Sequence, residues 1–419
     1  MIERLTVMTS RHDFLRLVAV AGLGGVRFDA AAADASTAKY GFQGLSGAEA
    51  TMFETLPHVQ LLGADAVGVA WMTAVRATGR VTWSQDGWAT EHAAVHGEGG
   101  LLDANSFTHK AVLRGVDLHK PLRYRVHSRR IGKFDIYGIG YAGDEVSYES
   151  VMDAPLPDDG VLSWAMLNDI HDNLKVYDCF LSHLADVRTM CIFNGDVMED
   201  LRNEEKFRLD FLNPFARVSQ ECRMPVWFVR GNHDTRGSLA RQLRDYVTLP
   251  RNRYFGAATL GGVRFAFVDT GEDKEDGHRE YRGLTDFDGY IAREIEWVKC
   301  EVASDEWKKA RARIVVQHIP APLCKDGWEP KLKRLDAPNE VWKTANVTLM
   351  MGAHLHWWCW SDPWEGRPYP LVVGGGPYLG NPAKHNNATL TKCRLEGRRL
   401  SVKVLDQTGK TVVDKEIHV

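Results

Sequence analysis

The chain has 419 residues, of which 44% are hydrophobic and 26% are charged, a composition typical of a globular protein with more than one domain. Its 55 acidic and 52 basic residues give a net charge of −3, so the sequence carries no strong nucleic-acid-binding signal. The seven cysteines are scattered and form no Cys-x-x-Cys pair, so nothing indicates a sulfur-rich zinc site or a dense disulfide framework.

Residues 1–35 have the layout of an export signal. Basic residues precede the short apolar run Leu15–Val26, and small residues follow it. That run is too short to span a bilayer as a stable helix, and the chain has no other transmembrane candidate. Residues 10–16 resemble the twin-arginine export motif, although His12 replaces the second arginine. We expect a periplasmic or extracellular protein; a frayed amphipathic helix on a cytoplasmic protein is the alternative.

Residues 36–152 form the first predicted domain, with short strands from residue 57 onward that are separated by turns. The clearest strands are His58–Leu62, Ala66–Met72, Arg80–Trp83, His109–Leu113, Leu122–Val126 and Phe134–Ile139. Several of them alternate apolar and polar residues, which favours a β-sandwich of about 100 residues. Two prolines and a glycine in Asp153–Gly160 then predict a linker.

Residues 153–385 form the second predicted domain, in which apolar strands alternate with helical stretches. The predicted helices are Glu204–Ala216, Ser238–Val247 and Tyr290–Ala303. This alternation predicts an α/β domain with a sheet covered by helices. The tail, residues 386–419, returns to strands that we expect to pack on this domain.

Polar residues follow five strands of the second domain. After the strands that end near residues 167, 193, 229, 317 and 351 stand, in order, Asp169 and His171; Asp196; Asn232, His233 and Asp234; His318; His354 and His356. Each group taken singly is an ordinary turn or a satisfied histidine. In layered α/β folds, however, ligands bind where the carboxyl ends of strands emerge, so five such ends together indicate one site.

Histidine, carboxylate and amide ligands without thiolate suit zinc, manganese or iron. The number of candidate ligands is larger than one tetrahedral ion needs. The simplest interpretation is a site for two divalent or trivalent ions that share one carboxylate. Two such ions bind the oxygens of a phosphoryl group and lower the pKa of a bound water. The pattern therefore predicts metal-dependent hydrolysis of phosphate esters.

The ordered motifs resemble the signature of the calcineurin-like metallophosphoesterase superfamily over roughly residues 160–385. The resemblance implies a layered β-sandwich flanked by helices. It assigns one metal to Asp169, His171, Asp196 and His356, and a second metal to Asp196 as a bridge, Asn232, His318 and His354. It also implies that His233 is the catalytic histidine that assists departure of the leaving group, with Asp234 orienting its ring. Another acid or a backbone carbonyl could orient His233 equally well.

The first domain resembles the fibronectin-III-like domain that precedes the catalytic domain of purple acid phosphatases, chiefly in its strand pattern around Trp71 and residues 109–126. The catalytic motifs depart from those phosphatases at two positions. Their first motif has glycine where this chain has His171, and their tyrosine ligand falls at Glu199. Without that tyrosine the iron-to-phenolate colour should be absent and iron becomes less certain. The arginine-bearing loop of protein Ser/Thr phosphatases is also missing after Asp196, which disfavours protein phosphatase activity.

Residues around the motifs leave several alternatives open. Trp357, Trp358, Trp360 and Trp364 either form an aromatic wall or pack beneath the site, and we favour packing. For the basic side chains Arg230, Lys325, Lys331, Lys333 and Arg334 we expect solvated positions rather than phosphate contacts. The acidic run Glu272–Asp276 is expected to be an exposed loop.

The sequence thus predicts an exported, two-domain metallophosphoesterase with a dinuclear metal centre and a metal-bound water as the nucleophile. A phosphomonoesterase acting on small-molecule phosphate esters is the first hypothesis, and a phosphodiesterase acting on nucleotides or lipid head groups is the alternative. A non-catalytic surface binding protein with a vestigial metal site is the alternative of another class. The oligomeric state stays open.

Overall fold

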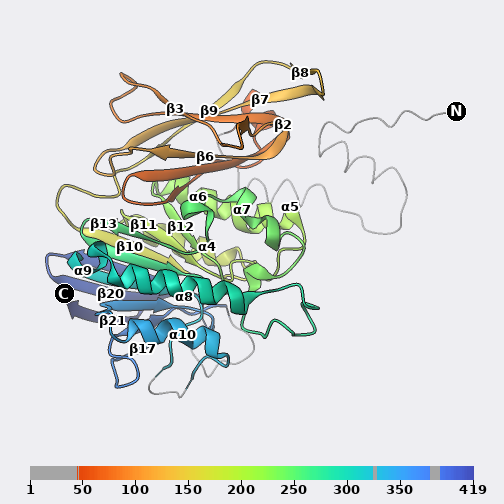
Figure 1. The fold of residues 1–419 in the computed structure, drawn as a ribbon. Helices are drawn as coiled ribbons and strands as arrows, with labels where there is room; N and C mark the ends of the chain where they lie inside the picture. Colours follow the sequence, from red (N-terminus) through yellow and green to blue (C-terminus); the bar gives the residue numbers. More distant parts are fainter. Residues whose placement is uncertain (1–44, 46, 324–327, 378–386) are drawn as a thin grey trace.

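The computed structural model describes residues 45, 47–323, 328–377 and 387–419. Two β-sheets pack face to face in the second half of the chain, and helices cover the outer face of each sheet (Figure 1). The predicted α/β sandwich flanked by helices is therefore confirmed. The expected export segment, residues 1–35, lies outside the described residues.

The first sheet has 13 strands among the described residues, and its main path runs β21-β20-β19-β10-β11-β12-β1-β2-β7-β8. Its central strands β10, β11 and β12 are parallel, and the tail strand β19 pairs antiparallel with β10. The bounds of these central and tail strands are β10 (Leu162–Leu167), β11 (Met190–Asn194), β12 (Val226–Val229), β19 (Thr389–Glu396), β20 (Arg399–Asp406) and β21 (Thr411–His418).

The second sheet has the order β13-β14-β15-β16-β18-β17. Strands β14, β15, β16 and β18 are parallel, with an antiparallel strand at each edge. The bounds are β13 (Gly256–Leu260), β14 (Val263–Val268), β15 (Ala312–Gln317), β16 (Leu349–Gly352), β17 (Cys359–Ser361) and β18 (Leu371–Val373).

Alternation along the strands explains the layers, because successive side chains point to opposite faces of a sheet. On β10, Trp164 points toward the second sheet, where its ring lies 5.1 Å from that of Phe265. On β12, Trp227 stacks on Phe267 at 3.8 Å. The neighbouring residue Ala165 points the other way, into a cluster with the helices on the outer face. Both faces of these strands are buried, as in other parallel sheets.

The helices cover the two outer faces. On the first sheet, a continuous helical segment is formed by α5 (Glu204–Phe207), a π-helical turn (Arg208–Leu212) and α6 (Asn213–Glu221). The other helices are α3 (Gly47–Met52), α4 (Lys175–Phe180), α8 (Phe287–Ala303), α9 (Asp305–Lys309) and α10 (Lys333–Trp342). The predicted helix Ser238–Val247 is wrong as a single element. It divides into a 3₁₀ turn, Ala240–Gln242, and α7 (Leu243–Tyr246), because Gln242 (φ −100°, ψ −2°) departs from helical geometry.

The N-terminal strands lie above helices α5, α6 and α7 in Figure 1. The bounds are β1 (His58–Leu61), β2 (Ala66–Ser84), β3 (His92–Ala94), β4 (Gly97–Glu98), β5 (Leu101–Leu102), β6 (Ser106–Arg114), β7 (Leu122–Asp135), β8 (Gly138–Tyr141) and β9 (Val146–Met152). Strand β1 pairs in parallel with β12, at Gln60 and Val226, so these strands continue the first sheet. A fibronectin-III-like domain stays a prediction.

Two strand predictions in this region need correction. The predicted strands Ala66–Met72 and Arg80–Trp83 are parts of the single strand β2, which pairs with β6 along its first part and with β7 along its last. A register shift between Met72 and Ala77 marks the change of partner. The predicted strand Phe134–Ile139 instead spans a hairpin: β7 ends at Asp135, residues 136 and 137 form the turn, and β8 begins at Gly138.

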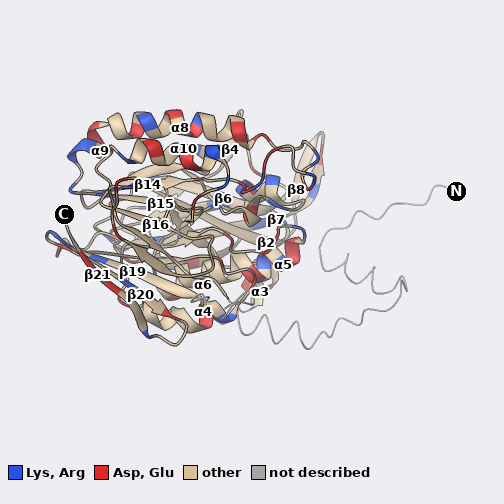
Figure 2. Ribbon diagram, turned by 90° about the horizontal axis from the view of Figure 1, so that it is seen from below, with Lys and Arg blue, Asp and Glu red and all other residues tan. Residues whose placement is uncertain are grey.

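Charged residues are frequent along α8 and α10, whereas the strands β14, β15 and β16 beside them are largely free of such residues (Figure 2). Within the described ranges, every helix is too short or too polar to cross a membrane.

Candidate metal centre

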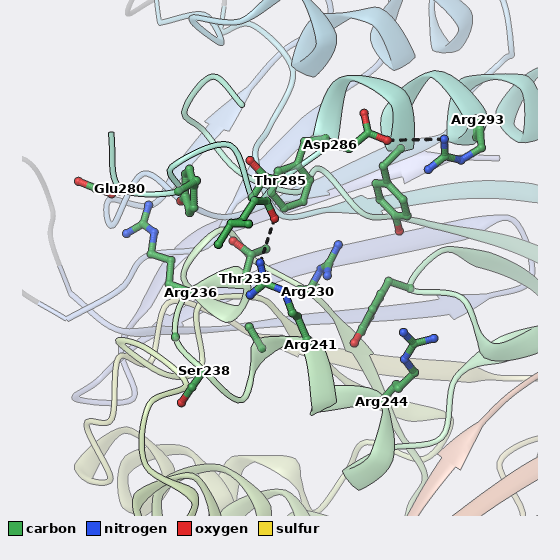
Figure 3. A pocket seen from close by; sticks show the side chains of 17 residues that line it. Arg230, Thr235, Arg236, Ser238, Arg241, Arg244, Glu280, Thr285, Asp286 and Arg293 are labelled. Atoms are coloured by element: carbon green, nitrogen blue, oxygen red, sulfur yellow. Dashed lines mark hydrogen bonds and ion pairs between the residues drawn. The ribbon is translucent and has the colours of Figure 1, made fainter. Parts of the chain in front are cut away.

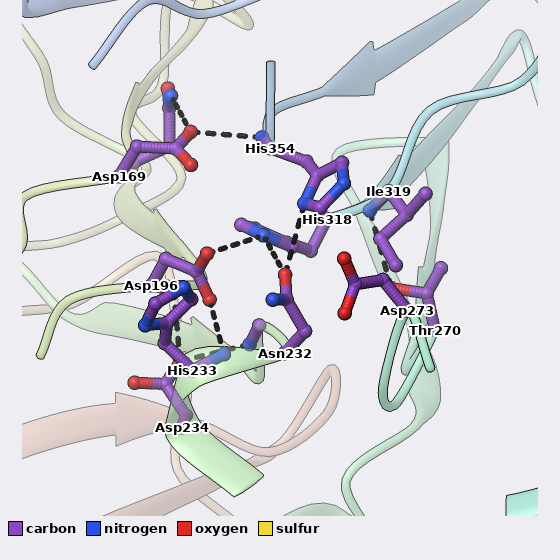
Figure 4. Close-up of polar contacts among 12 residues, drawn as sticks. Asp169, Asp196, Asn232, His233, Asp234, Thr270, Asp273, His318, Ile319 and His354 are labelled. Atoms are coloured by element: carbon purple, nitrogen blue, oxygen red, sulfur yellow. Dashed lines mark hydrogen bonds and ion pairs between the residues drawn. The ribbon is translucent and has the colours of Figure 1, made fainter. Parts of the chain in front are cut away.

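The predicted site residues come together at one edge of the two sheets, where strands β10, β11, β12, β15 and β16 end (Figure 4). Because β10, β11 and β12 are parallel to one another, as are β15 and β16, their carboxyl ends share an edge. The first sheet supplies Asp169, His171, Asp196, Asn232 and His233, and the second sheet supplies His318, His354 and His356.

The backbone is left-handed at five of the seven predicted ligands. The φ values are 48° at Asp169, 46° at His171, 50° at Asp196, 72° at His354 and 58° at His356. Residues other than glycine avoid this region, and each such position costs on the order of 1–3 kcal/mol. Strained backbone conformations of this kind cluster at functional sites, so their concentration at these turns supports a functional role.

Two glycines allow the turns after β11 and β12 to approach each other. A Cβ atom on Gly231 would lie 2.3 Å from Oδ1 of Asp196, and one on Gly195 would lie 2.4 Å from Nδ1 of His318. Only Gly195 has a positive φ, of 78°. Gly231 is therefore required by close packing rather than by a left-handed backbone.

One cluster of ligand atoms is formed by Asp169, His171 and His356, whose donor atoms lie within 4.8 Å of one another. Oδ1 of Asp169 is 3.6 Å from Nε2 of His356. That Oδ1 and Nε2 of His171 are buried and have no hydrogen-bond partner in the described structure. Buried polar atoms without partners are costly unless a cation binds them, so this donor set fits a metal.

A second cluster is formed by Asp196, His318 and His354, and Asn232 adds its amide. Oδ2 of Asp196 lies 3.2 Å from Nε2 of His318 and 3.7 Å from Nε2 of His171, so it stands between the two clusters. Oδ1 of Asn232 lies 3.2 Å from Nε2 of His318 and 2.9 Å from Nδ1 of His354. The reversed amide would direct its nitrogen at the same atoms and its oxygen at Arg236; the inward oxygen is the orientation that binds a metal.

Positive charge is favoured in this second cluster. Burial opposes a charge on His318, but the Asp196 carboxylate outweighs burial and raises the pKa of His318 to about 10. Burial, followed by the neighbouring His318, lowers the pKa of His354 to about 4, so His354 is neutral at pH 7. A neutral imidazole is the form that binds a metal, and a cation bound beside Asp196 would replace the proton of His318.

His233 is oriented by a backbone carbonyl. Its Nδ1 lies 2.7 Å from the carbonyl oxygen of Glu199, which leaves Nε2 as the nitrogen directed at other groups. Oδ2 of Asp234 instead accepts hydrogen bonds from the backbone N–H groups of Asp196, at 2.9 Å, and Gly231, at 2.8 Å. Asp234 therefore ties two ligand-bearing turns together, and its expected role as orienter of His233 is not supported by these contacts.

Sequence reasoning missed two residues beside His233. Oε2 of Glu199 lies 2.7 Å from Nδ1 of His171, so Glu199 contacts one ligand with its side chain and His233 with its carbonyl. Nη1 of Arg236 lies 2.9 Å from Nε2 of His233. Arg236 follows the predicted residue Asp234 by two positions, and Glu199 stands at the position of the purple acid phosphatase tyrosine ligand; neither residue was assigned a role from the sequence.

The acidic run after β14 is not the exposed loop that was expected. Glu272 is fully buried and makes a bidentate ion pair with Arg236, at 3.0 and 2.9 Å. Burial raises the pKa of Glu272 to about 7, and Arg236 opposes this rise. Asp273 adds a third contact to the same guanidinium group, at 3.2 Å. This pairing fixes Arg236 against His233.

Arg230, expected at a solvated position, is instead largely buried and pairs with Asp269 at 2.6 Å. Its guanidinium group stacks on Tyr254, 4.1 Å from the ring centre. The expected packing of the four tryptophans holds in part: Trp358 and Trp360 lie against the core between the sheets and Trp357 lies against an outer cluster, whereas Trp364 is exposed. Lys325 lies outside the described residues.

Two clusters of histidine and carboxylate ligands at the strand ends of a helix-covered β-sandwich define a metal-dependent hydrolase class. The family described as calcineurin-like phosphoesterase matches residues 164–358, a range that contains every predicted ligand. This match covers slightly less than half of the chain and, together with the ligand clusters, supports a hydrolase acting on phosphoric esters.

Two solved structures share the fold at low sequence identity. The purple acid phosphatase PPD1 from yellow lupin (Lupinus luteus) is 14% identical, with 86% of this chain and 74% of that chain covered and a TM-score of 0.63. A structure of PhoD is 11% identical, with 88% of this chain and 94% of that chain covered and a TM-score of 0.56. The comparison with curated proteins found no match.

Proposed function

We propose that the chain hydrolyses phosphate esters with two metal ions. Asp169, His171, Asp196 and His356 would hold one ion, and Asp196, Asn232, His318 and His354 would hold the other. The observation that carries this proposal is the place of Oδ2 of Asp196 between the two clusters, 3.7 Å from His171 and 3.2 Å from His318. One carboxylate oxygen shared by two sets of ligands is the arrangement that a dinuclear centre requires.

When bound, the metals would neutralise the phosphoryl oxygens and lower the pKa of the attacking water. In the reaction, the water oxygen forms a bond to phosphorus, the ester P–O bond breaks, and the leaving oxygen takes a proton. His233 is the side chain that we assign to supply that proton from Nε2, because Nδ1 donates to the carbonyl of Glu199. Nε2 accepts from Nη1 of Arg236 in this structure, so that contact has to open when Nε2 takes up a proton. Its ring is adjacent to the first cluster, 4.6 Å from the ring of His171.

We further propose that phosphomonoesters are the substrates, with Zn, Mn or Fe as the metals. The side chain at the position of the purple acid phosphatase tyrosine is Glu199, a carboxylate, so we expect a colourless enzyme. Rates measured side by side on an aryl phosphomonoester and a bis-aryl phosphodiester, with metal analysis of the same sample, test both points. Faster hydrolysis of the diester would replace the monoesterase proposal by the phosphodiesterase alternative.

The site itself is tested by Asp196→Asn in the full chain. We expect this variant to lose bound metal and to lose hydrolysis of the aryl phosphomonoester. Asp200→Asn is the matched control, because it removes the same charge from the same loop and its carboxylate pairs with Arg202 at 2.6 Å. Full activity and full metal content in Asp196→Asn would overturn the assignment.

Export remains part of the proposal, on the strength of the basic and apolar layout of residues 1–35. Fractionation of cells that express the full chain tests it, and processed protein outside the cytoplasm is the expected result. Unprocessed protein confined to the cytoplasm would contradict export.

A further inference from the structure

A cavity of about 820 Å³ is lined by residues that include Arg236, Arg241 and Arg244 (Figure 3). It adjoins the candidate metal centre through Arg236, which contacts His233. Its wall includes Thr235, Arg236 and Gly237, which directly follow His233 and Asp234 in the chain. Arg236 stands at the boundary, because its Nη1 lies 2.9 Å from Nε2 of His233. The volume is within the range of cavities that bind small organic molecules.

The charges of this cavity are unbalanced. Its lining contains five arginines, Arg230, Arg236, Arg241, Arg244 and Arg293, against two acidic residues, Glu280 and Asp286. Two of the arginines are neutralised by buried acids outside the lining: Arg230 by Asp269 and Arg236 by Glu272. Glu280 lies 3.6 Å from Lys274 and Asp286 lies 3.9 Å from Arg293.

Arg241 and Arg244 are therefore the cationic groups that this cavity leaves for a ligand. Nη2 of Arg241 donates to the carbonyl oxygen of Leu284 at 2.9 Å, and neither guanidinium group has a carboxylate partner among the described residues. The planar guanidinium group suits phosphate and carboxylate, which it binds through paired hydrogen bonds.

The remaining wall is aromatic. Tyr254, Tyr281, Phe287 and Tyr290 line the cavity. The hydroxyl of Tyr281 is buried and has no hydrogen-bond partner in the described structure, so it is available to a polar group of a ligand. The cavity thus offers an apolar surface together with two unpaired cations.

We infer that this cavity binds the leaving group of the substrate and that the leaving group carries a second anionic group, a phosphate or a carboxylate. The inference rests on the proposed function, in which Nε2 of His233 faces the leaving oxygen. A leaving group bound there extends past Arg236 into the cavity, where Arg241 and Arg244 meet its anionic group. Small phosphate esters with an uncharged leaving group leave these two arginines unused.

The experiment uses the full-length enzyme with its metals and two matched pairs of substrates. One pair is 4-nitrophenyl phosphate and the same ester with a carboxylate on the ring; the other is a sugar monophosphate and the corresponding bisphosphate. We expect wild type to have a higher kcat/KM for the anionic member of at least one pair. A preference in the aryl pair would indicate a carboxylate on the leaving group, and a preference in the sugar pair would indicate a phosphate.

The preference is expressed as kcat/KM for the ester with the anionic leaving group divided by kcat/KM for its uncharged counterpart. The double variant Arg241→Gln/Arg244→Gln should lower this ratio by at least about tenfold, because two charge-assisted contacts are lost. The change should be mainly in KM. Arg279→Gln is the control, because it removes a positive charge from the neighbouring loop and Arg279 is not among the lining residues. An unchanged ratio in the double variant, or no preference in wild type, overturns the inference. Absence of hydrolysis of any of the four esters by wild type would instead overturn the proposed function.

Discussion

Buried polar groups occur both among the N-terminal strands and at the strand ends of the metallophosphoesterase domain, and they differ in their partners. In the N-terminal region, Nε1 of Trp71 donates to Oγ of Ser128 at 3.0 Å, and Nε2 of His109 lies 2.9 Å from Oγ1 of Thr73. These are pairs of donor and acceptor. Nδ1 of His109 has no partner in the described structure, and His109 belongs to none of the clusters of candidate metal ligands among the described residues.

At the strand ends, by contrast, carboxylate oxygens and ring nitrogens from different strands converge. The ligand turns are also strained, whereas Trp88 and Asn105 are the only non-glycine positions with positive φ in the described part of residues 45–152. A buried histidine is therefore a weak indicator of function by itself. Convergence with carboxylates on a strained backbone is the stronger indicator.

The largest effect within this comparison is expected at His233. His233→Gln removes the proton donor and leaves the seven predicted ligands in place. We expect kcat to fall by about 10²- to 10⁴-fold, the usual size of a general acid contribution, with metal content unchanged. Steady-state kinetics on the aryl phosphomonoester and metal analysis check this. A kcat within a few-fold of wild type would remove His233 from the mechanism.

Asp234 should act on stability more than on the proton transfer. Asp234→Ala leaves the N–H groups of Gly231 and Asp196 without their acceptor, which should lower the free energy of unfolding by about 2–4 kcal/mol. Burial, and then the Asp196 carboxylate, raises the pKa of Asp234 to about 7, so a neutral Asn is a close replacement. Asp234→Asn should therefore lie within about 1 kcal/mol of wild type.

Urea denaturation of both Asp234 variants, with kcat measured alongside, separates the two roles of this residue. If Asp234 oriented His233, Asp234→Asn would reduce kcat strongly while the stability of both variants stayed near that of wild type. That result would contradict the contacts of Asp234 with the two turns.

The convergence of the candidate ligands was predictable, because each ligand directly follows a strand that can be recognised from its own residues. Each strand is a run of apolar residues that ends in a polar group, and the parallel order brings those ends to one edge, so the convergence of Asp169, Asp196 and His318 follows from the pattern. The α/β layers followed from the same alternation of strands and helices. In the N-terminal region, the join of two predicted strands into β2 depends on pairing with β6 and β7, which no local pattern encodes.

Contacts through the backbone were also beyond sequence reasoning. The carbonyl of Glu199 at His233 and the N–H groups at Asp234 have no side-chain signature. Glu272 stood in a run of charges that is typical of exposed loops, and its burial depends on pairing with Arg236. The sequence thus indicated which residues converge better than it indicated how each is held.

The smallest effect is expected at His58, a buried histidine of the N-terminal region whose ring packs on Phe215 at 4.9 Å. Burial lowers the pKa of His58 from 6.5 to about 3, against a weaker opposing effect of Gln60. Because the folded-state pKa is below the unfolded value, the stability from this group is fully present above pH 6.5 and is lost as pH falls toward 3. At pH 5 the loss is roughly 2 kcal/mol.

The measurement is the difference in the free energy of unfolding between pH 7 and pH 5, in wild type and in His58→Leu. We expect that difference to be smaller in His58→Leu by roughly 2 kcal/mol, because the variant has no imidazole to protonate on unfolding. His119→Leu is the control, since it removes an exposed imidazole from the same region. Equal pH dependence in wild type and His58→Leu would mean that His58 is accessible to protons in the folded state. The N-terminal region would then be loosely packed against α6, in contrast with the closed packing around the candidate ligands Asp169 and His318.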